Sequence, residues 1–383
     1  MFRLTRLLDQ ILQDSPLPTT RRAVAPVVVW NLIRRCNLSC LHCYAASSDR
    51  DFRNELSHPE VMQTLDDLKR AGVTALILSG GEPLLRPDLF EIATAAKTLG
   101  FHLALSTNGT LIDAAMARHI AGVAFDYVGI SIDGMEARHD VIRGETGAFN
   151  QALDGVRHLR DQDVTVGLRC TLTRDNTADL PELLQLMDRE RIPRLYLSHL
   201  NYAGRGIGNR QEAPSHEATR QAVRLLFDTA RADRHRDRPR EFVTGNNDAD
   251  GVLLLHYVQE FWPDRAERAA SLLRHWGGNA SGVGIANIDN RGFVHPDIFW
   301  WDHVLGNVRE KPFGEIWQQA RDELMVGLRQ RPRPVKGRCG ECGHLAICGG
   351  NTRVRAFHAT GDAWAEDPGC YLTDAEIAPA QGI

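Results

Sequence analysis

Short apolar segments alternate with longer amphipathic segments between about residues 27 and 200. The short segments have the length and β-branched composition of buried strands, and the longer ones repeat their apolar residues at helical spacing. The predicted strands are 27–33, 73–80, 101–108, 126–133, 164–172 and 194–200. The predicted helices are 57–71, 87–99, 111–121, 148–162 and 178–190, with capping signals at Ser57 and Asp113.

Strands that alternate with helices in this way predict an α/β protein with a parallel sheet and right-handed crossovers. Because six strands are too few for a closed eight-stranded barrel, we predict an open, partial (β/α)6 barrel over residues 26–235. Active groups of such folds lie on the loops that follow the strands. The first strand is followed by a group of cysteines, the second by GGEP (80–83) and the third by STNG (106–109). The sequence therefore predicts one polar site at this rim.

The segments outside the barrel have different patterns. In residues 1–25 the apolar positions fall at helical spacing between charged ones, which predicts an amphipathic arm packed on its own protein rather than a signal peptide. Residues 236–285 are predicted to form a bridging segment. Residues 286–383 are irregular and rich in glycine and tryptophan, as expected of a small domain held together partly by metal.

Composition narrows the function classes. With 43% hydrophobic and 25% charged residues the chain has the composition of a soluble globular protein, and no stretch is apolar enough to predict a membrane span. A formal net charge of −4 argues against a nucleic-acid binder. We expect a cytoplasmic protein whose thiols are reduced.

The eight cysteines are not spread evenly. Clustered cysteines in a cytosolic protein indicate metal binding rather than disulfides. Cys170 stands alone in a strand-like segment, which predicts a small core residue. The two groups are Cys36, Cys40 and Cys43 near the start, and Cys339, Cys342, Cys348 and Cys370 near the end.

Three thiolates do not complete a structural zinc site, which needs four ligands. They suit a [4Fe–4S] cluster in which one iron has no protein ligand and can bind the amino and carboxylate groups of S-adenosylmethionine (SAM). An electron passed from such a cluster to the sulfonium breaks a C–S bond and releases a 5′-deoxyadenosyl radical. Cys36, Cys40 and Cys43 are therefore the predicted catalytic ligands.

The motif Cys36-x3-Cys40-x2-Cys43, followed by an aromatic residue, resembles the signature of the radical SAM superfamily. GGEP resembles the glycine-rich strand end that receives the SAM ammonium in that family, and STNG and SIDG (131–134) resemble later contact points. An arginine on the next strand suits the SAM carboxylate. The resemblance implies SAM contacts at Tyr44, Gly80, Gly81, Glu82, Ser106, Asn108, Ser131, Asp133 and Arg169.

The second cysteine group would by itself suit zinc. Together with the segments 287–297 and 305–317, it resembles the SPASM-type extension that holds auxiliary clusters in many radical SAM enzymes. Two cysteines of a full extension are replaced by Asp297 and Thr352, and both belong to the cluster nearer the barrel. The resemblance therefore implies two [4Fe–4S] clusters, one for SAM and one auxiliary, and leaves space for a large substrate.

A further resemblance, most of which lies outside the general SAM motifs, is to the radical SAM enzymes of heme d1 biosynthesis. It covers 27–45, 199–206, 240–252, 276–283 and 295–308. This resemblance implies a didecarboxysiroheme-like tetrapyrrole whose propionate side chains are attacked, and an external electron donor. The auxiliary cluster would accept the electron that the substrate radical loses. Three alternatives remain: a related heme-pathway enzyme that removes acetates or converts propionates to vinyl groups, a peptide-modifying SPASM enzyme, and a non-catalytic scaffold. The segment before the first strand is short for the peptide-clasping domain of the second alternative.

A flat macrocycle that carries carboxylates requires aromatic surface and cationic side chains. A histidine in this region either ligates the macrocycle iron or is hydrogen-bonded within the fold. Adjacent Trp300 and Trp301 cannot both face one pocket from a strand. The candidate substrate contacts are His199, Arg205, His295, Trp300, Arg353 and Arg355.

Overall fold

The computed structural model describes residues 1–14, 25–208 and 210–378. Ten strands form one sheet in the order β10-β9-β8-β1-β2-β3-β4-β5-β6-β7. Neighbours from β1 to β7 are parallel, β8 pairs parallel with β1, and β9 and β10 are antiparallel. The strands are β1 Val27–Asn31, β2 Ala75–Ser79, β3 His102–Thr107, β4 Tyr127–Ser131, β5 Val166–Leu172, β6 Arg194–His199, β7 Glu241–Gly245, β8 Ile285–Ile288, β9 Phe293–His295 and β10 Gly306–Asn307.

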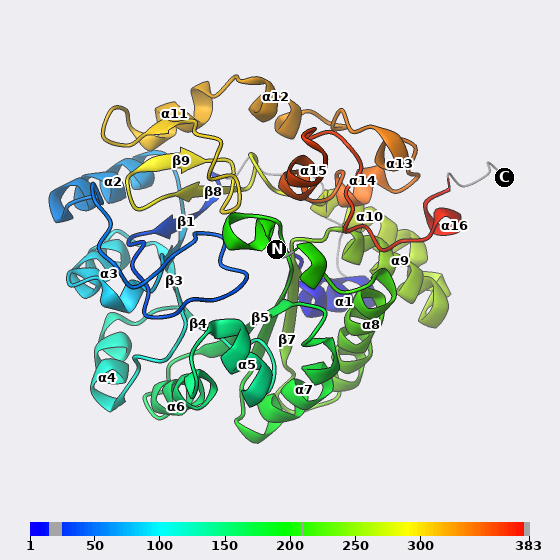
Figure 1. Ribbon diagram of the computed structural model, residues 1–383. Coiled ribbons are helices and arrows are strands. Elements are labelled where there is room, and N and C mark those ends of the chain that lie inside the picture. The colour runs from blue at the N-terminus through cyan, green and yellow to red at the C-terminus, as the bar shows by residue number, and fades with distance from the viewer. Residues whose placement is uncertain (15–24, 209, 379–383) are drawn as a thin grey trace.

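Helices surround the curved sheet, and residues 285–378 lie across the upper part of the view, where β8 is beside β1 (Figure 1). The helices of the barrel are α2 His58–Arg70, α3 Leu89–Thr98, α4 Ala114–Val123, α5 Glu136–Arg143, α6 Ala148–Arg160, α7 Leu180–Arg189 and α8 His216–Asp233. The others are α1 Leu4–Leu12, α9 Ala249–Phe261, α10 Ala266–Trp276, α11 Phe313–Gln319, α12 Glu323–Arg329, α13 Gly337–Gly340, α14 Leu345–Cys348, α15 Arg353–Thr360 and α16 Asp374–Ile377.

The predicted α/β partial barrel is confirmed, and all six predicted strands are present. The parallel strands outnumber the six predicted, because β7 pairs with β6 and β8 pairs with β1, which makes eight. The five residues of β7, EFVTG, follow a charged stretch and carry no alternating pattern, so this segment was not predicted as a strand. The helix α5 was also missed, because its sequence EARHDVIR is mostly polar.

The two predicted helix caps, Ser57 and Asp113, are present at the starts of α2 and α4. The backbone N–H of Ser57 donates to Glu60 Oε2 at 2.7 Å in a capping box before α2. Before α4, Asp113 Oδ1 accepts from the backbone N–H of Met116 at 2.7 Å. These bonds satisfy amide groups that have no partner within the first helical turn.

The N-terminal arm packs on the barrel as predicted, over the part of it that the structure describes. Phe2 exchanges two backbone hydrogen bonds with Thr244 of β7, at 2.7 and 2.9 Å. Leu4, Leu8 and Ile11 of α1 are fully buried. The rest of the predicted arm, residues 15–24, lies outside the described residues.

A buried ion pair attaches the C-terminal region to the barrel. Arg355 of α15 donates to both carboxylate oxygens of Asp367, at 2.7 and 2.8 Å. The same guanidinium donates to the carbonyls of Leu200 and Asn246, which follow β6 and β7. One side chain therefore joins two barrel loops to the C-terminal region.

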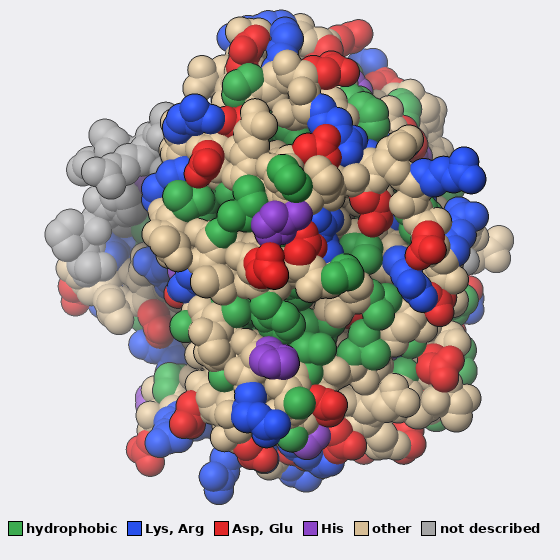
Figure 2. All heavy atoms as spheres, turned by 90° about the vertical axis from the view of Figure 1, so that its left-hand side faces the viewer, with side chains coloured by type: hydrophobic (Ala, Val, Ile, Leu, Met, Phe, Trp, Pro, Cys, Tyr) green, Lys and Arg blue, Asp and Glu red, His purple; other side chains and the backbone are tan. Residues whose placement is uncertain are grey.

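Neither a membrane-spanning helix in the described part of the protein nor a broad area of one charge on the face shown in Figure 2 is seen. Within the described ranges, no helix is long and apolar enough to span a membrane. On the face shown in Figure 2, acidic and basic side chains are interspersed, without a broad area of one sign.

We predict that Arg355→Met destabilises the protein by about 3–5 kcal/mol, because it leaves the Asp367 carboxylate buried without its cation. Urea unfolding measures the change. The matched control is Lys336→Met, which removes an exposed ion pair with Asp362 and should change the free energy of unfolding by less than about 1 kcal/mol. Equal effects of the two substitutions would contradict this role of Arg355.

Candidate functional site

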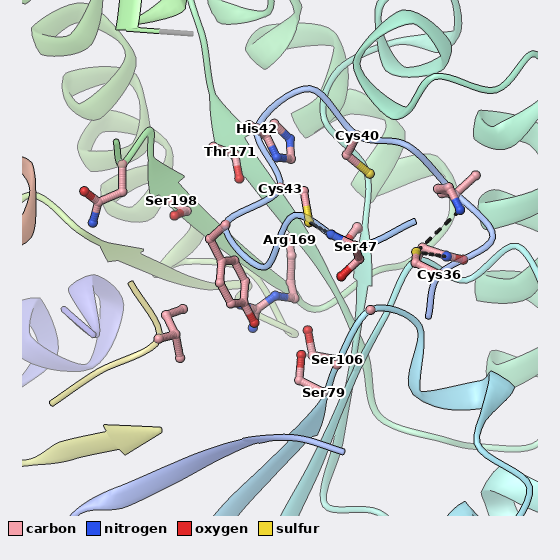
Figure 3. Close-up of a pocket in the computed structure, with 18 of the residues that line it drawn as sticks. Cys36, Cys40, His42, Cys43, Ser47, Ser79, Ser106, Arg169, Thr171 and Ser198 are labelled. Atoms are coloured by element: carbon pink, nitrogen blue, oxygen red, sulfur yellow. Dashed lines mark hydrogen bonds between the residues drawn. The ribbon is translucent and has the colours of Figure 1, made fainter. Parts of the chain in front are cut away.

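Three cysteine side chains meet at the carboxyl ends of the parallel strands. Cys36, Cys40 and Cys43 lie on the loop that follows β1, and all three line one pocket (Figure 3). Cys36 and Cys40 are only 6% and 8% exposed. The loops after β1 to β6 form the walls of this pocket, as the sequence predicted for its rim.

Hydrogen bonds converge on the sulfur atoms. The backbone N–H of Leu38 donates to Cys36 Sγ at 3.4 Å, and that of Ser47 to Cys43 Sγ at 3.5 Å. Burial raises the pKa of the Cys36 thiol to about 12, and the nearby Glu82 adds to the rise. A bound metal would displace these protons, because thiolates are its ligands. The donors and the burial fit a metal group held by three thiolates.

Several buried polar atoms of the pocket have no partner among the described residues. They are Ser47 Oγ, Arg143 Nε, Asn201 Nδ2 and Arg205 Nη2. Arg205 also holds the cysteine loop, since Nε donates to the Cys40 carbonyl at 2.7 Å and Nη1 to the Ser47 carbonyl at 2.6 Å. Buried polar atoms are nearly always hydrogen-bonded, so these atoms fit a pocket that receives a polar ligand.

Most of the predicted SAM contacts line this pocket. In Figure 3, Arg169 lies between the cysteine loop and the pair Ser79 and Ser106. Its guanidinium lies 4.7 Å from the ring centroid of Tyr196, which fixes its position. The predicted contacts that line the pocket are Tyr44, Gly80, Gly81, Ser106, Asn108, Ser131 and Arg169.

Glu82 lies beneath the pocket rather than in its wall. Its carboxylate is fully buried and accepts from Thr107 Oγ1 at 2.7 Å, from the Asn108 N–H at 2.8 Å and from the Leu84 N–H at 3.1 Å. Burial raises its pKa to about 7. Glu82 therefore joins the ends of β2 and β3, and its side chain is not part of the pocket lining.

The two glycines before Glu82 serve close packing of the backbone. A Cβ atom on Gly81 would lie 2.2 Å from the Arg35 carbonyl oxygen. The Gly81 N–H donates to the Ile33 carbonyl at 2.6 Å. The loops after β1 and β2 are thus pressed together, which aligns the cysteine loop with the glycine-rich turn.

Asp133, the other predicted contact outside the pocket lining, is fully buried. It bonds to His42 Nε2 at 2.7 Å, to the Thr171 N–H at 2.6 Å and to Arg143 Nη2 at 2.6 Å. Burial opposes its ionisation, but Arg143 and His42 hold the pKa of Asp133 below its usual range. His42 and Arg143 both line the pocket, and sequence reasoning missed them.

Of the six candidate substrate contacts, only His199 and Arg205 line the pocket. His199 Nε2 is bonded to the buried Asp250 at 3.0 Å. The other four are engaged in the C-terminal region, where Trp300 packs on Phe357 and Arg353 donates to the Ala363 and Ala365 carbonyls. Asn201, Asn246 and Phe299 also line the pocket and were missed. Asn201 directly follows the predicted strand 194–200, and this position could have identified it as a site residue. Asn246 directly follows β7, which was not predicted.

The second cysteine group lies in the C-terminal region. Arg338 Nη1 donates to Cys370 Sγ and the His344 N–H to Cys342 Sγ, each at 3.4 Å. Burial raises the pKa of Cys342, Cys348 and Cys370. Among the described residues, no three His, Cys, Asp or Glu side chains are arranged to hold a single metal ion. In an iron–sulfur cluster the thiolates bind a larger group, so their sulfur atoms need not converge on one ion.

The two positions where a full extension has cysteines are occupied by hydrogen-bonded side chains. Ser281 Oγ donates to Asp297 Oδ2 at 2.5 Å, and Thr352 Oγ1 donates to the Asn246 carbonyl at 2.9 Å. Both side chains are thus built into the protein structure.

Comparison with known proteins agrees with this geometry. Residues 30–187 match the profile of the Radical SAM superfamily. The chain is 52% identical to the "Pre-heme d1 synthase" of Dinoroseobacter shibae, over 100% of this chain and 95% of that protein. It is 44% identical to the "Fe-coproporphyrin III synthase" of Methanosarcina barkeri, over 92% and 89%. The crystal structure of Streptococcus suis SuiB bound to S-adenosylmethionine has a TM-score of 0.70 at 18% identity, covering 91% of this chain and 78% of that one.

The likeness to SuiB shows the fold alone, whereas the two sequence relatives extend over nearly the whole chain. A [4Fe–4S] cluster and SAM follow from membership of the superfamily that residues 30–187 match. The chain is a radical SAM enzyme and belongs to the radical SAM superfamily, in the family that includes pre-heme d1 synthase.

Proposed function

We propose that this enzyme acts in heme d1 biosynthesis and attacks the propionate side chains of a didecarboxysiroheme-like tetrapyrrole on the way to the ring oxo groups. The observation that carries the proposal is the 52% identity to pre-heme d1 synthase, which spans the whole chain and not only the cysteine motif. The pocket supplies the chemical setting, with three thiols, buried hydrogen-bond donors and a guanidinium in one place.

In this proposal Cys36, Cys40 and Cys43 hold the cluster that binds SAM. When bound, the two groups together supply a 5′-deoxyadenosyl radical, which removes a hydrogen atom from the substrate. Arg169 faces the SAM carboxylate, since a guanidinium binds carboxylates through paired donors. The proposed remaining contacts are Tyr44, Gly80, Gly81, Ser106, Asn108 and Ser131, while Glu82 and Asp133 support them from below.

The substrate is proposed to lie between the cysteine loop and the segment after β9. Arg205 Nη2 and Asn201 Nδ2 are donors without protein partners in this pocket, as a carboxylate of the substrate requires. The aromatic ring of Phe299 borders the same space and suits a flat macrocycle. His199 presents an imidazole whose Nε2 is already bonded to Asp250, which leaves Nδ1 for the substrate.

We further propose one auxiliary [4Fe–4S] cluster, held by Cys339, Cys342, Cys348 and Cys370. It makes two clusters in the chain, with the barrel-proximal one of a full extension missing. The hydrogen bonds of Asp297 and Thr352 support this count, since both side chains are engaged with the protein. The auxiliary cluster would accept the electron lost by the substrate radical, and an external donor would reduce the cluster that binds SAM.

A second candidate function is removal of acetate side chains, favoured by the 44% identity to Fe-coproporphyrin III synthase. The peptide-modifying alternative has weaker support, because similarity to SuiB concerns the fold. A non-catalytic scaffold would have no use for an open three-thiol site beside the glycine-rich turn.

The substrate assignment is tested with anaerobically reconstituted, reduced enzyme and SAM. Didecarboxysiroheme should stimulate formation of 5′-deoxyadenosine, and its own mass should change through loss of atoms from its propionates. Iron coproporphyrin should neither stimulate 5′-deoxyadenosine formation nor change in mass. Chromatography with mass spectrometry measures both products. A mass change at the acetates would support the second candidate function instead. No response to didecarboxysiroheme would refute the proposed substrate.

Each of Cys36→Ala, Cys40→Ala and Cys43→Ala should abolish 5′-deoxyadenosine formation, because two thiolates do not hold the cluster that binds SAM. Iron analysis should show a loss of about four iron atoms out of about eight per chain, since the auxiliary cluster stays. Cys170→Ser, a change of a buried cysteine outside both groups, is the control and should keep the iron. Continued SAM cleavage in any of the three variants would refute the ligand assignment.

Cys342→Ala should leave reductive SAM cleavage partly intact but stop completed turnover, because the proposed electron acceptor is lost. Single-turnover assays that quantify 5′-deoxyadenosine and modified tetrapyrrole separate the two steps. Normal turnover by this variant would mean that the auxiliary cluster has no part in the reaction.

A further inference from the structure

A buried network of charges lies directly behind the cysteine loop. Its centre is Asp133, at the end of β4, whose side chain is 0% exposed. His42, from the cysteine motif itself, reaches it from one side, and Arg143 from the other. The Thr171 N–H, on the neighbouring strand β5, completes the set. Two loops, the strand β5 and the end of α5 therefore converge around one carboxylate.

Arg143 connects this network to a cluster ligand. While Nη2 bonds to Asp133, Nη1 donates to Cys40 Sγ at 3.5 Å. The guanidinium side chain is only 9% exposed, so little water screens its charge. Arg143 also lines the pocket, and its Nε is buried with no partner in the part of the chain that the structure describes.

The backbone at the end of α5 fixes the same loop. The Ser39 N–H donates to the Arg143 carbonyl at 3.2 Å, and the Leu41 N–H donates to the Ile142 carbonyl at 2.9 Å. These two bonds flank Cys40 on either side in the sequence. The position of Cys40 Sγ is thus set by α5 through the backbone and through the guanidinium together.

The carboxylate of Asp133 opposes the charge of Arg143 at Cys40 only in part, because Arg143, which contacts the sulfur directly, lowers the pKa of the Cys40 thiol more than Asp133 raises it. His139 lies in the same buried layer, and burial, with Arg143 beside it, lowers the pKa of His139 to about 4, so it is neutral. Its Nδ1 accepts from the Asp133 N–H at 3.0 Å. Asp133 is the only carboxylate paired with Arg143 among the described residues, and it is shared with His42.

We propose that Arg143 is a positioning residue that holds Cys40 and makes the SAM-binding cluster easier to reduce. The proposal rests on the cluster at Cys36, Cys40 and Cys43 that is part of the proposed function. A positive charge and a hydrogen bond on a ligating sulfur both stabilise the cluster after it gains one electron, because that electron adds negative charge. Asp133 and His42 keep the guanidinium in place.

The test is a redox titration of the reconstituted, full-length enzyme, with a chemical reductant as electron source and no tetrapyrrole. The EPR signal that changes when SAM is added reports the SAM-binding cluster. We expect Arg143→Gln to lower its midpoint potential, so that the ratio of reduced to oxidised clusters at the parent midpoint falls about tenfold, equivalent to about 59 mV for one electron. Arg143→Lys keeps the charge and should recover part of the shift.

Arg138→Gln is the matched control, because Arg138 lies on the same helix but is 44% exposed and paired with Asp179. It should leave the midpoint unchanged. An unchanged midpoint in Arg143→Gln with full iron content would overturn the proposal. Loss of iron from both Arg143 variants would also overturn it, because Arg143 would then only be needed to build the loop. Loss of iron from the Gln variant alone supports it. If the parent enzyme bound no cluster at the three cysteines, the proposed function itself would fail.

Discussion

The hydrogen-bonded register of the parallel strands is the constraint on which the site depends. Parallel pairing from β1 to β7 places the residues that follow each strand at one edge of the sheet. The cysteine loop, the glycine-rich turn and the loops after β3 to β6 are thereby brought together although they are spread over about 170 residues of sequence. A slip of one residue in a strand would turn its pocket-facing side chains into the helical layer.

The elements of the barrel could be predicted from sequence wherever burial imposes a pattern. Strands covered on both faces are continuous apolar runs, and helices such as α2 and α7 carry one apolar stripe. The strand β7 was missed because its residues, EFVTG, follow a charged stretch and show no alternating pattern. The helix α5 was not predicted because its sequence, EARHDVIR, has no continuous apolar face; its buried residues are His139, Ile142 and Arg143.

The site could be predicted as far as its residues follow strand ends, as Gly80 after β2 and Asn108 after β3 do. Side-chain direction could not be predicted, because it depends on partners distant in sequence. Glu82 and Asp133 point into the protein toward Thr107 and Arg143, so they act as supports. Phe299 borders the pocket while its neighbour Trp300 packs on Phe357, a choice that the sequence alone leaves open.

The pairing of β8 with β1 has a consequence for biosynthesis of the chain. Val27 lies opposite Ile285, so the strand that leads into the cysteine loop is flanked on one side by residues translated much later. Until the ribosome has released that segment, the outer edge of β1 has unpaired backbone groups, which are prone to pair with other chains. The strand before the first three cysteines therefore has both of its neighbours only after β8 has been synthesised.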